Sequence, residues 1–268
     1  MRPLDIPANI AKYLDGNISL DEMCKSASEG YAQLSGASPE VSIVIPAYNE
    51  ENNIVPTLMS LCTNKTERIV EIIVVNNNSQ DRTEELTIAC GVKCVFQPVQ
   101  GITVSRNMGL SNATGTYILN ADADSIYPEH WIENMIKPLE HPAVAMTYGR
   151  FSLIPTANTG RSVYFFYEYI AEFSRWVNKF IKDEAVNVYG FNSGFRRKEG
   201  LEVNGFDHPP GTNEDGWLAV KLRDKGFGRL ELVKEIKALV WTTDRRIQMD
   251  GGLVSGVWKR LKRVLLKR

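Results

Sequence analysis

Residues 117–125 read YILNADADS, an apolar run followed by two carboxylates, Asp122 and Asp124, that are separated only by Ala123. The aromatic and β-branched run at 117–119 predicts a short buried strand. The two acids then lie at its carboxyl end, which is the edge where open α/β sheets bind ligands. Their oxygens suit a hard divalent cation and, through it, phosphates. A plain turn is the alternative, because Asp and Ser also terminate strands.

The composition is that of an ordinary globular protein. The 268 residues are 43% apolar and 24% charged, which allows one large domain with a sizeable core. The 31 Lys and Arg nearly balance the 32 Asp and Glu, which argues against a protein that binds nucleic acid. The four cysteines form no zinc-ligand pattern, so we expect buried thiols in a reducing cytosol. Without a recognisable signal peptide or membrane-spanning run, we expect a cytoplasmic protein.

Strand-like and helix-like segments alternate through the first half of the chain. Apolar, β-branched runs predict strands at 41–45 (stopped by Pro46), 69–75, 93–96 and 117–119. Helical spacing follows these runs near 54–61, 81–90 and 103–111. This alternation predicts an α/β fold with a mostly parallel, doubly wound sheet and right-handed crossovers. The first strand is not followed by Gly-x-Gly-x-x-Gly, which argues against a dinucleotide-dependent oxidoreductase.

The second half is less regular. We expect a short helix at 128–139, a strand at 144–149 and an aromatic-rich helical stretch within 151–188. Most of these aromatic side chains are expected to pack in the core, and a few to form an apolar wall for an acceptor. Farther on, Thr212 or Asn213 is placed to cap a helix whose first turn contains Glu214 and Asp215.

The last residues combine apolar and basic side chains. The segment GVWKRLKRVLLKR at 256–268 contains six Lys and Arg among regularly spaced Val, Leu and Trp. This pattern predicts a basic amphipathic helix, and residues 254–268 are expected to contact an anionic membrane surface at its cytoplasmic side. A solvated, frayed terminus is the alternative.

Five segments in this order resemble the family 2 glycosyltransferases with a GT-A fold: VSIVIPAYNEE, IIVVNNNSQDRT, GITVSRNMGLSNATGTYILNADADS, GFNSGFRRKEGLEVNGFD and NEDGWLAVKLRDKG. The resemblance covers about residues 41–244, and ordered motifs are far more specific than any one of them. It implies a Rossmann-like, mostly parallel sheet flanked by helices. It also implies transfer of a sugar from a nucleotide diphosphate donor, with inversion, by an enzyme that uses Mg²⁺ or Mn²⁺.

The resemblance also implies which residues bind the donor. Pro46, Ala47, Tyr48 and Glu50 resemble the start of the family's nucleotide pocket, with the Tyr48 ring available to stack on a base. Asn77 stands where the family usually has Asp, and its amide is expected to hydrogen-bond a uracil edge, so that a UDP-sugar is the expected donor. Arg106 matches a family Arg-Asn pair, and its guanidinium suits a phosphate or a carboxylate.

The acids receive separate roles from the same resemblance. Asp124 is expected to bind the metal, and Asp122, with Ala123, to bind the metal or the ribose of the donor. Asp215 is expected to be the general base, with Glu214 orienting it or binding the acceptor. Further candidates for contacts with the donor are Asn192, Arg245 and Arg246. The two arginines are expected to bind the diphosphate or to mark a mobile loop; an ordinary surface salt-bridge face is the alternative.

These expectations divide the chain into a helical extension at 1–38, a GT-A domain at 39–250 and a basic amphipathic tail at 251–268. Within the GT-A domain, residues 41–125 are expected to form the nucleotide-binding half and residues 126–250 the acceptor and catalytic half. The acceptor is expected to be a glycan or a lipid-linked carbohydrate of cell-surface polysaccharide synthesis. A nucleotidyltransferase and a catalytically silent nucleotide-sugar-binding protein are the alternatives. A nucleotidyltransferase usually has a Gly-rich loop with a Lys after its first strand. In this chain the corresponding segment, PAYNEENN at 46–53, contains neither Gly nor Lys.

Overall fold

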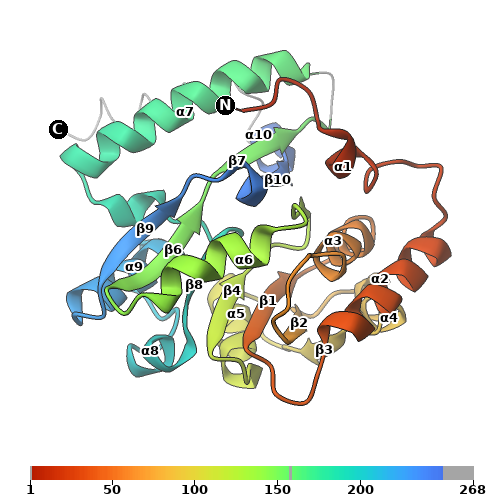
Figure 1. Ribbon diagram of the computed structural model, residues 1–268, viewed down its shortest axis with the longest axis horizontal. Coiled ribbons are helices and arrows are strands. Elements are labelled where there is room, and N and C mark those ends of the chain that lie inside the picture. The colour runs from red at the N-terminus through yellow and green to blue at the C-terminus, as the bar shows by residue number, and fades with distance from the viewer. Residues whose placement is uncertain (1, 157–158, 250–268) are drawn as a thin grey trace.

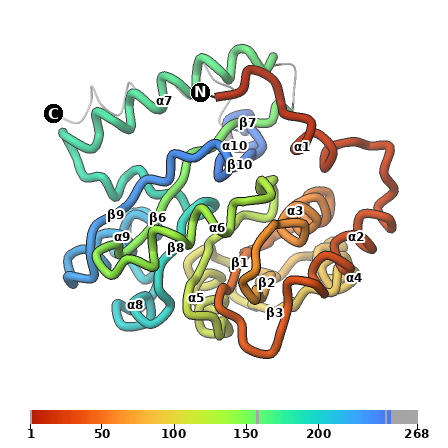
Figure 2. Tube along the Cα trace, in the orientation of Figure 1, coloured from red at the N-terminus to blue at the C-terminus, as the bar shows by residue number. Residues whose placement is uncertain are grey.

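The computed structural model describes residues 2–156 and 159–249, and its centre is a seven-stranded sheet (Figure 1, Figure 2). From one edge to the other, the strands are β3 (Lys93–Phe96), β2 (Val70–Asn76), β1 (Val41–Ala47), β4 (Tyr117–Asn120), β8 (Ser193–Arg196), β6 (Val144–Gly149) and β9 (Arg229–Val233). Strand β1 pairs in parallel with both β2 and β4. Only β8 among these strands runs antiparallel to its neighbours. The structure therefore confirms the mostly parallel α/β sheet.

Helices cover both faces of this sheet (Figure 1). The apolar sides of one group join the larger core cluster: α2 (Leu20–Leu34), α3 (Ile54–Cys62), α4 (Thr83–Ala89) and α6 (Trp131–Ile136). The opposite face is covered by α5 (Ile102–Asn112), α8 (Arg197–Glu202) and α9 (Glu214–Asp224). Because successive side chains of β1 point to opposite faces, Ile43 and Ile45 belong to the first cluster and Val44 to the second.

A second, smaller sheet lies beside the acids that follow β4. Its order is β5 (Ser125–Ile126), β10 (Val240–Thr243) and β7 (Phe151–Ile154). Ser125 is paired with Thr242, so the residue after Asp124 is held against the end of β10. The chain continues from β10 into α10 (Arg245–Met249). This small sheet therefore brings a segment from the end of the described chain to the carboxyl edge of the large sheet.

Strand β1 continues past its proline, although we expected Pro46 to stop it. Pro46 lies opposite Val75 of β2, and the strand ends at Ala47. On the other side, pairing with β4 reaches only Val44 and Asn120. Carbonyls and amides of alternate residues face opposite sides, so the missing N–H of Pro46 faces the side where the ladder has ended, and no sheet hydrogen bond is lost.

Residues 151–188 form several elements instead of one helical stretch. Strand β7 comes first, then α7 (Arg161–Ile181), and then the 3₁₀ turn η2 (Glu184–Asn187). The expectation that most of the aromatic residues pack in the core is wrong. Tyr164 is fully buried, but Phe166, Phe173 and Trp176 are 66%, 65% and 60% exposed. The charged side of α7 faces the protein instead.

The termini are described only in part. Helices α1 (Ala8–Ala11) and α2 lie in the predicted N-terminal extension, and Ser19 and Glu22 form a capping box at the start of α2. The two further 3₁₀ turns are η1 (Lys137–Glu140) and η3 (Ile236–Ala238). The predicted tail at 251–268 lies outside the described residues. Within the described ranges, no helix has the length and apolarity needed to cross a bilayer.

Candidate active site

The turn after β4 is fixed from two sides. The hydroxyl of Thr57, on α3, donates to the carbonyl of Ala123 at 2.9 Å. The backbone N–H of Asp122 donates to the Tyr127 hydroxyl at 2.9 Å, and this hydroxyl donates in turn to the carbonyl of Phe191. Ala123 is buried, whereas the side chains of Asp122 and Asp124 keep 19% and 14% of their surface exposed. Both carboxylates are therefore positioned at the surface of a cleft by buried contacts.

A cavity of ≈ 530 Å³ opens beside this turn. Its lining contains nine of the predicted residues: Pro46, Ala47, Tyr48, Glu50, Asn77, Asp122, Ala123, Asp124 and Arg245. The ring of Tyr48 is half exposed, as stacking on a flat ligand requires. Residues separated by two hundred positions in the sequence thus line one concave surface of a size suited to a nucleotide.

Asp124 is surrounded by groups from three segments. The Thr243 hydroxyl donates to Oδ2 of Asp124 at 2.9 Å, and Arg245 Nη2 lies 3.1 Å from the same oxygen. Arg245 also forms a two-pronged ion pair with Glu50. Burial raises the pKa of the Asp124 carboxyl, and the neighbouring carboxylates of Asp122 and Glu50 raise it further. This corner of the cavity is therefore short of positive charge even with the Arg245 guanidinium in place.

Arg106, on α5, connects the donor-side acids to the predicted base. Its side chain is 2% exposed and lies between two carboxylates: Nη2 is 3.0 Å from Asp122 Oδ1, and Nε is 3.4 Å from Asp215 Oδ1. Within the described chain, Nε and Nη1 of this buried guanidinium have no hydrogen-bond partner. Unpaired buried donors are costly, so this guanidinium is suited to bind a further anionic group.

Asp215 lies in the first turn of α9, and the side chain of Asn213 caps this helix by accepting from the Gly216 N–H at 2.7 Å. Burial is the main cause that raises the pKa of Asp215 to about 6, against the opposing attraction of Arg106. Among residues 2–156 and 159–249, no group donates a hydrogen bond to its Oδ1, which has only the Arg106 guanidinium beside it at 3.4 Å. A carboxylate with a pKa near neutrality and an oxygen that accepts no hydrogen bond is suited to accept a proton.

Gly190 makes this close approach possible. A Cβ at this position would lie 2.1 Å from Arg106 Nη2 and 2.5 Å from each carboxylate oxygen of Asp215. No side chain other than hydrogen fits there without moving the pair. Gly190 is the first residue of the segment GFNSGFRRKEGLEVNGFD, and its role in this contact was not predicted.

Three residues that were predicted to contact the sugar donor are placed differently from the others. Asn77 lines the cavity, but its amide binds a loop: Nδ2 donates to the Val99 carbonyl at 2.8 Å and Oδ1 accepts from the Gly101 N–H at 2.8 Å. Asn192 is buried, accepts from Trp131 Nε1 at 2.8 Å and donates to the Arg150 carbonyl at 2.8 Å. Its amide supports the fold, so the expected donor contact is replaced by a structural one. Arg246 lies in α10, and its side chain is outside the described part.

Two further groups of residues at this site were not predicted from the sequence. Gln100, Gly101 and Ile102 line the cavity on the loop that Asn77 holds. Asp244 is completely buried and accepts from the Thr156 N–H at 2.8 Å, from the Tyr164 hydroxyl and from Gln248 Nε2 at 2.8 Å. These bonds fix the start of α10, and with it Arg245. A buried Asp before two arginines carries no sequence signal that separates it from a surface turn.

The carboxylate oxygens at this corner of the cavity are of the type that binds a hard divalent cation. Asp122, Asp124 and Glu50 present only carboxylate oxygens, and a guanidinium already occupies part of the space between the last two. Among the described residues, no three acidic, His or Cys side chains converge closely enough to form a complete metal site. A cation at this corner would need further ligands from outside the protein, such as water or phosphate oxygens.

Solved structures share this architecture. The mannosyltransferase PcManGT of Pyrobaculum calidifontis, in complex with GDP-Man and Mn²⁺, superimposes with a TM-score of 0.59 at 18% identity, over 95% of this chain and 75% of that one. TarS of S. aureus in complex with UDP-GlcNAc gives 0.57 at 16% identity, over 76% and 58%. Glucosyl-3-phosphoglycerate synthase of Mycobacterium tuberculosis, with Mn²⁺ and UDP-Glc, gives 0.52 at 20% identity, over 79% and 72%. The fold is that of the GT-A glycosyltransferases.

Sequence comparison gives the family. The family model "Glycosyl transferase family 2" matches residues 42–199, so the chain belongs to this family. An uncharacterized glycosyltransferase of Rickettsia conorii is 28% identical over 134 residues, which are 48% of this chain and 22% of the relative. Glycosyltransferase GlyA of Streptococcus pneumoniae is 26% identical over 117 residues, 42% of this chain and 17% of the relative. The match thus spans about a fifth of the length of these relatives.

Proposed function

We propose that this glycosyltransferase transfers a sugar, with inversion, from a nucleotide diphosphate donor to a hydroxyl of a glycan or lipid-linked acceptor in cell-surface polysaccharide synthesis, at the cytoplasmic face of a membrane. The observation that carries the proposal is the position of Arg106 between Asp122 of the donor cavity and the buried Asp215. This arrangement joins a site for a diphosphate to a proton acceptor, which inverting transfer requires in one place. A nucleotidyltransferase or a catalytically silent binding protein does not require a proton acceptor such as Asp215 beside the diphosphate site.

In the proposed reaction, Asp215 accepts the proton of the acceptor hydroxyl while the hydroxyl oxygen forms a bond to the anomeric carbon of the sugar. The bond from that carbon to the diphosphate breaks, and the nucleoside diphosphate leaves with the electron pair. Arg106 and Arg245 stabilise the negative charge that develops on the leaving group. Glu214, one residue before the base, orients it or binds the acceptor.

Asp124 and Asp122, with Glu50 beside them, are proposed to hold Mg²⁺ or Mn²⁺. When bound, such a cation neutralises charge on the diphosphate as a Lewis acid. The raised pKa of Asp124, caused by burial and by the two neighbouring carboxylates, fits a site that gains stability from a cation.

The donor is proposed to be a UDP-sugar whose base stacks on Tyr48. Since the amide of Asn77 binds the loop at 97–101, Asn77 acts by shaping the wall formed by Gln100, Gly101 and Ile102. Two of the similar structures contain UDP-GlcNAc and UDP-Glc, and one contains GDP-Man. Both nucleotides therefore belong in the test.

The test is a thermal-shift panel of UDP- and GDP-sugars with and without Mn²⁺, because a ligand that binds the folded state raises its melting temperature. We expect a UDP-sugar to stabilise the wild type only with the cation, Asp124→Ala to lose this shift, and Asp215→Asn to keep it while losing transfer. Stabilisation that is independent of the cation, or wild-type transfer by Asp215→Asn, contradicts the proposal.

A further inference from the structure

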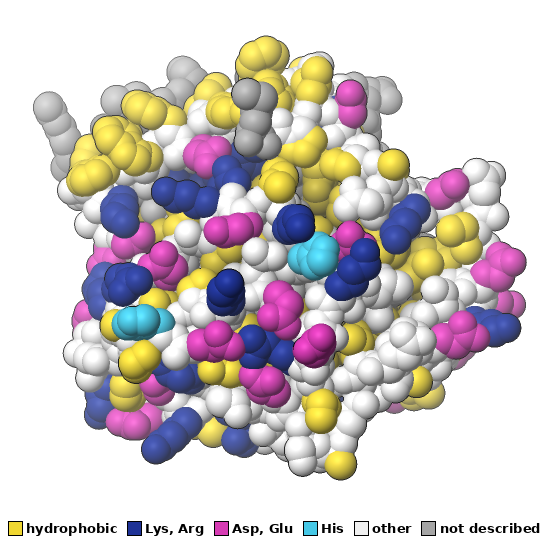
Figure 3. All heavy atoms as spheres, in the orientation of Figure 1, with side chains coloured by type: hydrophobic (Ala, Val, Ile, Leu, Met, Phe, Trp, Pro, Cys, Tyr) yellow, Lys and Arg dark blue, Asp and Glu magenta, His cyan; other side chains and the backbone are white. Residues whose placement is uncertain are grey.

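Helix α7 presents its apolar side to solvent. Large apolar residues recur at i, i+3 and i+7 along its whole length and are between 48% and 75% exposed: Val163, Phe166, Ile170, Phe173, Phe180 and Ile181. Tyr169 and Trp176, 40% and 60% exposed, border this stripe. Figure 3 shows hydrophobic side chains gathered along the end of the molecule where α7 lies in Figure 1. We call these eight residues the outer face of α7.

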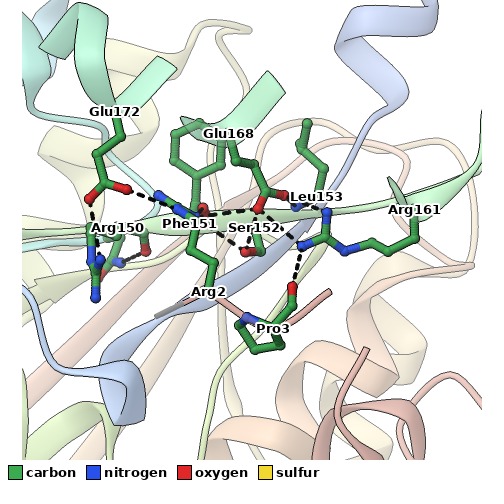
Figure 4. Close-up of polar contacts among 10 residues, drawn as sticks. Arg2, Pro3, Arg150, Phe151, Ser152, Leu153, Arg161, Glu168 and Glu172 are labelled. Carbon is green, nitrogen blue, oxygen red and sulfur yellow. Dashed lines mark hydrogen bonds and ion pairs between the residues drawn. The ribbon is translucent and has the colours of Figure 1, made fainter. Parts of the chain in front are cut away.

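The opposite side of α7 is charged, and it faces the protein (Figure 4). Glu168 is 1% exposed; it accepts from the Leu153 N–H at 2.7 Å and from the Ser152 hydroxyl at 3.0 Å, and it pairs with Arg161 at 3.0 Å. Arg2 is almost completely buried and lies between Glu168 and Glu172. Removing one member of such a cluster leaves an unpaired buried charge, so the cluster fixes the helix in this orientation.

The exposed stripe is therefore a consequence of how the helix is attached. Rotating α7 to bury its aromatic residues would bring the charged groups into solvent and break the ion pairs with Arg2 and with Arg150, 3.2 Å from Glu172. A folded protein that leaves a continuous apolar surface of this size exposed generally covers it with a partner.

We propose that the outer face of α7 docks on the surface of an anionic membrane. The stripe is wider than the seam of a two-stranded coiled coil, because the flanking positions that would carry pairing charges hold Tyr169, Trp176 and Ile181. Aromatic residues with a polar atom at their edge suit the boundary between headgroups and acyl chains.

Basic groups lie along one edge of the stripe. A cavity of ≈ 590 Å³ opens between α7 and β9, and Trp176 and Phe180 form part of its lining. Its lining has five bases, Arg150, Arg175, Lys179, Arg229 and Lys234, against three acids, Glu172, Glu184 and Glu231. Three of the bases are paired with these acids, so the excess positive charge comes from Arg175 and Lys234. Residues 251–268 lie outside the described residues; their sequence contains six Lys and Arg and no acid. Positive charge of this kind attracts anionic headgroups.

The contact has a consequence for the substrate, which rests on the proposed function. Tyr164, on the inner side of α7, donates to Asp244, and the next residue, Arg245, lines the donor cavity. Docking of α7 thus brings the donor cavity close to the headgroups, where a lipid-linked acceptor lies.

The test compares the binding of the full-length protein to vesicles of phosphatidylcholine with and without phosphatidylglycerol. We expect the wild type to co-sediment with the anionic vesicles. The double variant Ile170→Glu, Phe173→Glu is expected to lose binding on the order of a hundredfold, because two large apolar side chains no longer enter the lipid. Ile88→Glu on α4, where the side chain is 59% exposed, is the matched control and is expected to bind as the wild type does.

Three results overturn the proposal. If the double variant binds anionic vesicles as the wild type does, the outer face of α7 is not the contact. If removal of residues 251–268 alone abolishes binding, the tail is the contact. If the wild type ignores vesicles and forms a dimer that the double variant disrupts, the partner is a second copy. The donor-induced thermal shift, measured without vesicles, should be unchanged in the double variant. If the wild type shows no donor-induced thermal shift, this result contradicts the proposed function but not the docking of α7 on a membrane.

Discussion

Replacing Asp215 by Asn removes a buried charge and keeps the shape of the side chain. Burial is the main cause that raises the pKa of this carboxyl from 3.8 to about 6. A difference of about two pK units means that ionisation of Asp215 destabilises the folded state by about 3 kcal/mol at neutral pH. Because the folded pKa is the higher one, this destabilisation is absent below pH 3.8, grows as the pH rises toward 6 and is complete above it. The variant is neutral at every pH and should gain that amount.

The assay is urea unfolding at several pH values between 4 and 8, alongside transfer activity. Asp215→Asn should raise the free energy of unfolding by up to about 3 kcal/mol at pH 7 but by only about 0.5 kcal/mol near pH 4, while transfer falls about a thousandfold. Asp224→Asn, the same change at an exposed position of α9, is the control and should stay within about 0.5 kcal/mol of the wild type. A variant that is less stable than the wild type at pH 7, or a gain that does not change with pH, refutes the reasoning.

Three further predictions concern the same site. Arg245→Gln frees the two carboxylates that it pairs with, so calorimetry should find tighter Mn²⁺ binding but about tenfold weaker binding of the nucleotide diphosphate; unchanged affinities contradict this. Gly190→Ala pushes a Cβ into Arg106 and Asp215 and should cost about 2 kcal/mol or more of stability together with most of the activity, whereas Gly16→Ala, with no atom within 4 Å, should change neither. Finally, kcat/KM should rise with pH around a midpoint near 6, where Asp215 loses its proton, and a flat profile between pH 5 and 7 argues against this base.

Much of the fold was predictable because its signals are local. The apolar, β-branched strands β1 and β2 are buried on both faces, and such runs are typical of a parallel sheet covered by helices. The cap at Asn213 is likewise a local signal and is confirmed, whereas α3 begins after Asn53 without a side-chain cap. The predicted end of β1 was wrong, because Pro46 interrupts the sheet only if β4 still pairs with β1 at that position, and the sequence does not show where this pairing ends.

The candidate site was predictable as a set of residues but not as a set of contacts. The order of motifs pointed to nine residues that line the donor cavity. It gave no sign that the amides of Asn77 and Asn192 bind the protein's own backbone, or that Arg106 lies between Asp122 and Asp215. Hydrogen-bond capacity and the pKa of a buried acid depend on which groups surround it, and those groups come from distant segments.

The sequence by itself determined the alternation of strands and helices, the acids at the end of β4 and the amphipathic pattern of α7, because each depends on residues that are neighbours along the chain. Only the tertiary structure decided which side of α7 faces solvent. A periodic pattern defines a face, but the buried side is chosen by available partners, and Arg2 and Arg150 provide them for Glu168 and Glu172. In the same way, the carboxyl of Asp215 owes its raised pKa to burial, which no stretch of sequence contains.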